Sequence, residues 1–233
     1  MNVNREKKYL WLAPEQTNSE LFYHLFMESG FECLHSQEHR KNKLGFSQDE
    51  WDESEFQDYE IITSLKNPYD RLVQIYLEYE IKPVIPITKD LEPKLIDLFQ
   101  KWVLDIFETN KLVVRVNDWG KDVLISKVIK KFLFRNRIPS IAVRSEFLVD
   151  DLSNIVNIVS RFDLQKKKEL ETILINESSK MKFDFKNFYT FDIAKIVYNY
   201  YFNHFYIGNY DPFSFSNVEM TEREKNKFIH DTF

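Results

Sequence analysis

The sequence predicts an α/β protein in which a mostly parallel sheet is flanked by helices in a three-layer arrangement. Short apolar runs typical of strands alternate along the chain with longer segments whose apolar residues recur at helical spacing. Such alternation predicts parallel strands that are covered on both faces. The 233 residues, 43% of them hydrophobic, are enough for one large domain, and no repeat or low-complexity linker divides them. We therefore expect a single domain over residues 1–233.

Four apolar runs are the expected strands. They cover residues 9–13, 31–34, 61–65 and 140–143. Pro14 ends the first of them, because proline has no N–H to continue a strand ladder.

The expected helices follow from apolar residues that repeat every three to four positions. They cover residues 21–29, 69–80, 91–108, 123–134, 150–159, 165–171 and 191–205. Gly30 follows the first helix and Gly208 the last, as expected of glycine near a helix C-terminus.

Composition and charge exclude several classes of protein. The net charge of −5 argues against a general nucleic-acid binder. A single cysteine, Cys33, excludes an intrachain disulfide framework and a cysteine-rich metal site, and we interpret it as a buried strand residue. The acidic run at 49–60 lacks the glycine and the ligand spacing of an EF-hand. We therefore expect no bound metal.

The sequence contains no apolar run of the ~20 residues that a membrane-spanning helix needs. Its first residues also lack the pattern of a signal peptide. We therefore expect a soluble, cytoplasmic protein without a membrane partner. The sequence does not indicate an oligomeric state.

The most informative stretch is a predicted strand–turn–helix corner. The strand at 61–65 leads into Lys66, Asn67 and Pro68, and the next helix begins directly afterwards. A helix N-terminus favours anions, since its first amides have no partner within the helix and the helix dipole is positive there.

Residues 66–76 of this corner have the sequence KNPYDRLVQIY. This sequence resembles the segment RNPYDRLVSAY with which sulfotransferases hold the 3′-phosphate of their sulfate donor. That donor is PAPS, 3′-phosphoadenosine 5′-phosphosulfate. Residues 13–21 are similar to the family's 5′-phosphosulfate loop, residues 142–152 to its late strand and following helix, and residues 203–211 to its closing segment. The resemblance implies a P-loop NTPase-like sulfotransferase fold, PAPS as co-substrate and PAP (3′,5′-adenosine bisphosphate) as product.

The first loop departs from the family pattern. Glu15 stands where the family has a donor-binding lysine, and the family's glycines are absent. The polar residues that follow could still cradle a phosphate through side chains and backbone amides; they are Gln16, Thr17, Asn18 and Ser19. One of these residues could instead serve only as the cap of the following helix.

The resemblance implies that Lys66 and Gln74 contact the 3′-phosphate. Lys66 replaces the family arginine, which keeps the charge but loses the bidentate fork. Gln74 replaces the family serine and can still donate a hydrogen bond. Arg71 is a further candidate for cofactor binding, although an arginine at this place also fits a structural role beside its helix.

The resemblance also implies a general base after the second strand. His35 is the first choice, because the unperturbed pKa of histidine lies near working pH. Glu38 and His39 are alternatives. The basic piece at 40–43 could steer an anionic acceptor.

Aromatic residues are frequent in the last long helix. We interpret them as core packing, with a sugar-binding platform as the alternative; they are Tyr198, Tyr201, Phe202 and Phe205.

Three functions remain open at this point. The first is a PAPS-dependent sulfotransferase that acts on a hydroxyl of a carbohydrate or other small acceptor. The second, suggested by Glu15, is a catalytically impaired protein of the same fold that binds a nucleotide, a glycan or a protein. The third is a nucleotide-dependent phosphotransferase, which is disfavoured because no Gly-Lys-Ser/Thr motif is present.

Overall fold

The structure is a computed structural model, and it describes residues 2–12, 25–33, 56–82, 84, 86–109, 113–116, 121–124, 139–155, 157–159, 168, 172 and 183–230. The chain forms two compact units. Unit 1 comprises residues 1–66 and 130–175, and unit 2 comprises residues 67–129 and 176–233. Each unit is therefore assembled from segments that are far apart in the sequence, and a single domain over the whole chain stays a prediction.

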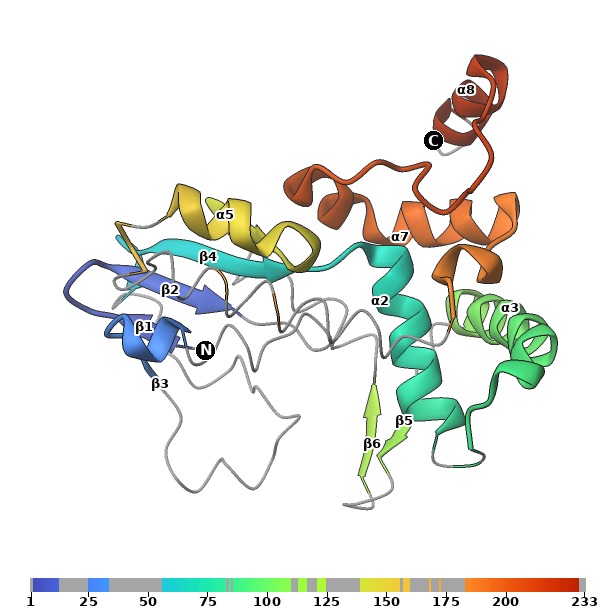
Figure 1. Cartoon of the computed structure of the whole chain (residues 1–233), viewed down its shortest axis with the longest axis horizontal. Helices are drawn as coiled ribbons and strands as arrows, with labels where there is room; N and C mark the ends of the chain where they lie inside the picture. Colours follow the sequence, from blue (N-terminus) through green and yellow to red (C-terminus); the bar gives the residue numbers. More distant parts are fainter. Residues whose placement is uncertain are drawn as a thin grey trace. The chain divides into compact units, whose positions relative to one another are not determined.

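Unit 1 contains a five-stranded mixed sheet (Figure 1) with the strand order β3-β1-β2-β4-β7. The strands are β1 (Asn2–Asn4), β2 (Tyr9–Leu12), β3 (Glu32–Cys33), β4 (Glu60–Leu65) and β7 (Ile141–Arg144). β4 pairs in parallel with both β2 and β7, whereas β1 pairs antiparallel with β2 and β3. The predicted α/β class is confirmed, and the four predicted strands are present.

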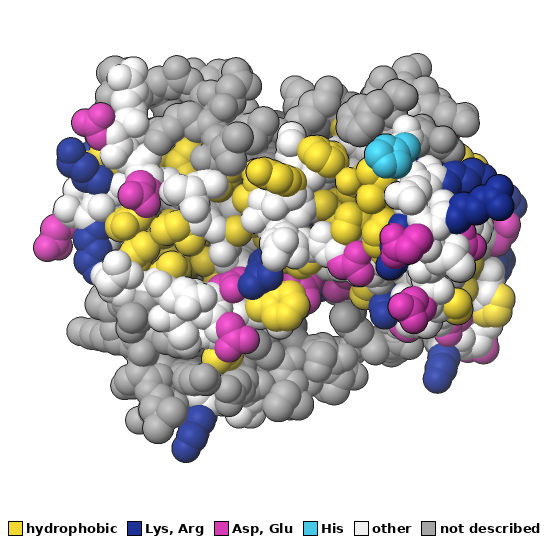
Figure 2. Space-filling model, turned by 90° about the horizontal axis from the view of Figure 1, so that it is seen from above, with side chains coloured by type: hydrophobic (Ala, Val, Ile, Leu, Met, Phe, Trp, Pro, Cys, Tyr) yellow, Lys and Arg dark blue, Asp and Glu magenta, His cyan; other side chains and the backbone are white. Residues whose placement is uncertain are grey.

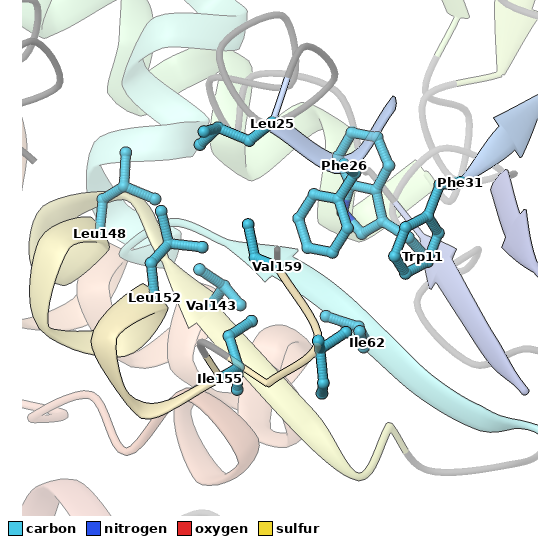
Figure 3. Packing of buried hydrophobic residues seen from close by; sticks show 11 residues of the cluster. Trp11, Leu25, Phe26, Phe31, Ile62, Val143, Leu148, Leu152, Ile155 and Val159 are labelled. Carbon is cyan, nitrogen blue, oxygen red and sulfur yellow. The ribbon is translucent and has the colours of Figure 1, made fainter. Parts of the chain in front are cut away.

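The main core of unit 1 lies on one face of the sheet. Helix α5 (Leu148–Asn154) and residues 25–31 cover this face. Figure 3 shows the cluster, in which Trp11 stacks on Phe26 with ring centroids 4.6 Å apart and an 8° angle between the ring planes. Its buried members are Trp11, Leu25, Phe26, Phe31, Ile62, Val143, Leu148, Leu152, Ile155, Ile158 and Val159. The first predicted helix is present over residues 25–28 and ends in a turn at Ser29 and Gly30. Gly30 has φ of +84°, a conformation that favours glycine.

The opposite face of the same sheet carries a smaller cluster, which is formed by Val3, Leu10, Phe56 and Ile61. Successive side chains of a strand point to opposite faces, so Leu10 and Ile61 lie opposite the main core. Five of the six residues of β4 are buried, as expected of a central strand in a sheet covered on both sides.

Unit 2 consists mainly of helices. They are α2 (Pro68–Ile75), which continues as a π-helical segment (Tyr76–Ile81), α3 (Glu92–Thr109), α7 (Phe191–Gly208) and α8 (Glu222–His230). α7 packs against α2 and α3. The predicted helices at 69–80, 91–108 and 191–205 are confirmed. The aromatic residues of α7 divide: Tyr198, Tyr201 and Phe205 are core residues as predicted, but Phe202 is 42% exposed.

One predicted helix is wrong where the structure describes it. Residues 121–124 form strand β6 (Lys121–Leu124), which pairs antiparallel with β5 (Val113–Val116), so the helix expected over 123–134 does not begin there. Three valines in β5 favour the extended conformation, and the cross-strand ladder outweighs the helical spacing of the apolar residues. The predicted helix at 150–159 also differs, since α5 begins at Leu148 and ends at Asn154.

Candidate functional site

The parallel strands of unit 1 share one carboxyl edge. The register pairs Leu12 with Thr63 and Leu65 with Arg144, so β2, β4 and β7 end on the same side of the sheet. In α/β sheets, ligands bind outside the carboxyl ends of the strands, where the connecting loops leave the sheet. This edge is therefore the candidate site of unit 1.

Lys66 is the first residue after β4 at this edge. Its residue surface is only 7% exposed, which is unusual for a lysine and brings a positive charge into a largely water-excluded place. Electrostatic attraction to an anion is stronger in such surroundings than at an open surface. The protein has a net charge of −5, so an anionic ligand requires a local cation, and Lys66 provides one at this edge.

Ser145 follows β7 at the same edge and is buried. Its hydroxyl donates a 3.0 Å hydrogen bond to the carbonyl oxygen of Leu65, directly before Lys66. Ser145 was not predicted from the sequence to be a site residue. Its signal is positional, because it follows one parallel strand as Lys66 follows the neighbouring one.

Arg144, the last residue of β7, is bound to α5. Its backbone N–H, Nε and Nη2 donate to the carboxylate of Asp151 at 2.7, 2.9 and 2.7 Å, and its guanidinium lies 4.4 Å from the ring centre of Phe147. A bidentate pair of this kind is among the stronger side-chain interactions. Arg144 therefore fastens α5 to the sheet.

A side-chain hydrogen bond also joins the neighbouring strands β2 and β4 near this edge. Trp11 Nε1 donates to Ser64 Oγ at 2.9 Å, and both residues are buried. This bond satisfies the indole N–H inside the core and fixes the side chain of the residue two positions before Lys66.

Helix α2, the first element of unit 2, begins with a well-formed cap. Asn67 Oδ1 accepts from the N–H of Tyr69 at 3.0 Å, Asn67 Nδ2 donates to Ser214 Oγ at 2.9 Å, and Pro68 takes the first helical position. The buried carboxyl group of Asp70 also lies in the first turn. The anion preference predicted for this N-terminus is therefore partly met by the protein's own oxygen atoms.

Tyr69 holds α2 inside unit 2, as the predicted core position requires. Its hydroxyl donates to the carbonyl oxygen of Pro212 at 2.8 Å, and its own carbonyl oxygen accepts from the hydroxyl of Tyr189 at 2.8 Å. Burial raises the pKa of the Tyr69 phenol well above its usual value, and Tyr198 and Asp211 raise it further. Tyr69 consequently stays neutral and acts as a structural anchor.

Gln74 and Arg71, the other two candidate residues of α2, both interact with residues of unit 2. Gln74 Nε2 donates to Asp70 Oδ1 at 3.3 Å, which is one turn of helix away. Arg71 is only 2% exposed, and its charge acts on Tyr201 and His204 of α7. These surroundings favour the structural role that the sequence left open for Arg71.

Arg71, Tyr201 and His204 form a buried group in which the pKa values of Tyr201 and His204 are shifted. Burial lowers the pKa of His204 well below its usual value, and the positive charge of Arg71 lowers it further. Burial raises the pKa of Tyr201, an effect that Arg71 partly opposes. The rings of Tyr201 and His204 meet edge to face with centroids 5.2 Å apart. His204 is therefore neutral near pH 7.

The remaining predicted site residues lie outside the described part of the chain. They are Gln16, Thr17, Asn18 and Ser19 of the first loop and the proposed base His35, together with its alternatives Glu38 and His39. The last described residue before them is Leu12, which ends β2 at the same edge of the sheet as Lys66.

The charges on the described surface have both signs. Figure 2 shows Lys and Arg side chains interspersed with Asp and Glu on the face in view. Within the described residues, no group of three or more His, Cys, Asp or Glu side chains could hold a metal ion. No helix in that part of the chain is long and apolar enough to cross a membrane.

Comparisons with known proteins identify no relative. No family model matches the chain, and neither the curated proteins nor the solved structures include a significant match.

Proposed function

We propose that this protein is a PAPS-dependent sulfotransferase that transfers a sulfuryl group to a hydroxyl of a carbohydrate or other small acceptor. The position of Lys66 is the main support for this proposal. This residue occupies the 3′-phosphate position of the sulfotransferase-like motif, and it lies buried at the carboxyl end of the central parallel strand. Sequence resemblance and the general location of ligand sites in α/β sheets thus lead to the same residue.

The proposed reaction is an in-line displacement at sulfur. The acceptor oxygen forms a bond to the sulfur atom, the bond between sulfur and the 5′-phosphate oxygen breaks, and PAP leaves. His35 takes the proton of the acceptor hydroxyl. Lys66 holds the 3′-phosphate, while Gln16 to Ser19 surround the phosphosulfate. Catalysis of this type depends on positioning and on charge stabilisation around the transferred group.

A catalytically impaired binding protein of the same fold is the second candidate. Glu15 favours it, because a carboxylate at the place of the family lysine repels the phosphosulfate and cannot neutralise charge on the leaving oxygen. Under this alternative the Lys66 edge would still bind a 3′-phosphonucleotide, but no sulfuryl group would move.

Thermal unfolding in the presence of nucleotides tests the binding step. A ligand at one hundred times its Kd stabilises the native state by about 2.7 kcal/mol. We expect PAP and PAPS to raise the Tm by several degrees, and AMP to have a smaller effect because it lacks the 3′-phosphate. ATP is the control for a general nucleotide or polyanion effect. Equal shifts with ATP and PAP, or no shift with PAP and PAPS at millimolar concentration, would reject the proposal.

Release of PAP from PAPS separates the two candidates. A sulfotransferase releases PAP in the presence of a suitable saccharide, and His35→Ala should lower that rate by about a hundredfold or more if His35 is the base. Binding of PAPS without PAP release across a panel of neutral and anionic saccharides would favour the impaired protein. Unchanged turnover in His35→Ala would move the base to Glu38 or His39.

A further inference from the structure

Helix α7 of unit 2, which Figure 1 labels, carries four exposed uncharged residues near its C-terminal end. We call them the α7 stripe; they are Asn199, Phe202, Asn203 and Tyr206. The spacing of Phe202, Asn203 and Tyr206 places these three residues along one face of the helix. Asn199 precedes them across a kink at Tyr201, whose backbone angles are not helical. Phe202 is 42% exposed and Tyr206 76% exposed, so two aromatic rings face outward from a helix whose opposite side forms the core.

The two rings are held in position by the core beneath them. Phe202 and Tyr206 are nearly parallel, with 15° between the ring planes and centroids 6.4 Å apart. Phe202 also packs edge to face on Tyr198, a buried residue that contacts Phe205 and Phe228. The pair is thus a supported platform, in contrast to single exposed apolar residues, which are common on protein surfaces. A pre-positioned platform loses little entropy when it binds.

The polar groups of the α7 stripe are available for a ligand. Within the described residues, the side-chain amides of Asn199 and Asn203 and the hydroxyl of Tyr206 make no hydrogen bond. Each amide offers donors and an acceptor, and the phenol offers one of each. Aromatic faces flanked by such groups match a molecule that presents C–H surfaces and hydroxyl groups together.

We propose that the α7 stripe binds a neutral oligosaccharide. The faces of aromatic rings carry negative potential, which attracts the slightly positive C–H groups on the face of a sugar ring. The asparagine amides and the tyrosine hydroxyl would then hydrogen-bond sugar hydroxyls. Two rings on successive turns suit two sugar units of one chain, which is how multivalent contact increases affinity.

The chemistry of the stripe disfavours other occupants. A nucleotide would require a cation for its phosphate, and none of the four stripe residues is charged. A second copy of the chain would require a larger apolar area than two rings separated by amides. Binding at the α7 stripe does not depend on the sulfuryl transfer proposed above.

Isothermal titration with cellohexaose, chitohexaose and maltoheptaose tests this site. We expect at least one of these sugars to bind, and the double variant Phe202→Ala/Tyr206→Ala to bind it about tenfold more weakly or not at all. Asn203→Ala should weaken it by about threefold. Val218→Ala, which truncates another exposed apolar residue of unit 2, is the matched control and should bind like the native protein.

Circular dichroism and thermal unfolding verify that the double variant is folded, as expected for exposed side chains. The proposal is overturned if none of the three sugars binds, or if the folded double variant binds with native affinity. It is equally overturned if the native protein forms a dimer that the double variant loses, since the stripe would then be an interface between copies. PAP binding is measured in parallel and should be the same in all variants.

Discussion

Lys66 and Arg71 are two buried cations of the same corner, five residues apart, yet they stand in different surroundings. Lys66 follows β4 at the carboxyl edge of the unit 1 sheet, directly after Leu65, whose carbonyl oxygen accepts a hydrogen bond from Ser145. Arg71 lies one turn into α2 and acts on Tyr201 and His204 inside unit 2. The difference teaches that burial of a cation does not identify a ligand contact; the surrounding groups decide between a binding role and a structural one.

The change of secondary structure between the two residues explains the difference. Lys66 is in the extended segment that leaves β4, where loops and ligands approach a sheet. Asn67 caps α2, and the 3.6-residue period then turns Arg71 toward the α7 side. Three predictions test this contrast.

The largest effect is expected from Arg71→Ala. The substitution removes one of the largest fully buried side chains and leaves a cavity lined by polar groups, so we expect a loss of about 3–5 kcal/mol in the free energy of unfolding. Urea denaturation measures it. Arg223→Ala, at an exposed position of α8, is the control and should change stability by less than about 0.5 kcal/mol. A loss below about 1 kcal/mol for Arg71→Ala would contradict the structural role.

A smaller effect is expected from acid, through His204. Its pKa in the folded protein is lowered below the value of about 6.5 in the unfolded chain, so the unfolded chain binds more protons in mildly acidic solution. The contribution of neutral His204 is therefore complete above about pH 7 and is lost as pH falls below about 6.5. One proton gives a slope of at most about 1.4 kcal/mol per pH unit.

Urea denaturation at several pH values between 5 and 7.5 measures this slope. His204→Gln should reduce it, because glutamine does not titrate. His230→Gln, at an exposed position, should leave it unchanged. If His204→Gln retains the full slope, then His204 is not the group that senses acid in the core of unit 2.

The smallest effect is expected from Asn67→Ala. It removes the α2 cap and the hydrogen bond to Ser214, and we expect a loss of about 1 kcal/mol in the free energy of unfolding. Asn199→Ala is the control, since this exposed amide makes no hydrogen bond within the described residues. Equal stabilities of the two variants would show that the cap does not hold the corner.

Much of the fold could be predicted because it depends on strong local patterns. The strand at 61–65 is a continuous apolar run, and the helices at 91–108 and 191–205 repeat over several turns. β1 was not predicted, because it consists of one valine between two asparagines. These three residues form a strand only by pairing with β2 and β3. Residues 123 and 124 were mistaken for a helix start, because the spacing of apolar residues does not reveal their pairing with β5.

The candidate site was predictable to a smaller extent. Lys66 could be found because it belongs to an unusual sequence motif and directly follows a clear strand. Ser145 could not be ranked, since its value depends on the parallel pairing of β7 with β4. The environment of Arg71 was equally hidden, because Tyr201 and His204 are 130 or more residues away in the sequence. Contacts between distant segments determine which polar residues of a motif are buried with partners.

The proposed contact between Lys66 and a 3′-phosphate can be tested by a cycle of two proteins and two ligands. Titration calorimetry gives the Kd of PAP and of AMP for the native protein and for Lys66→Ala. We predict that the native protein prefers PAP by about tenfold or more and that Lys66→Ala abolishes most of this preference, because the charge-assisted hydrogen bond is lost. Lys94→Ala, an exposed lysine of α3, should retain the preference. An undiminished preference for PAP in folded Lys66→Ala would show that Lys66 does not hold the 3′-phosphate.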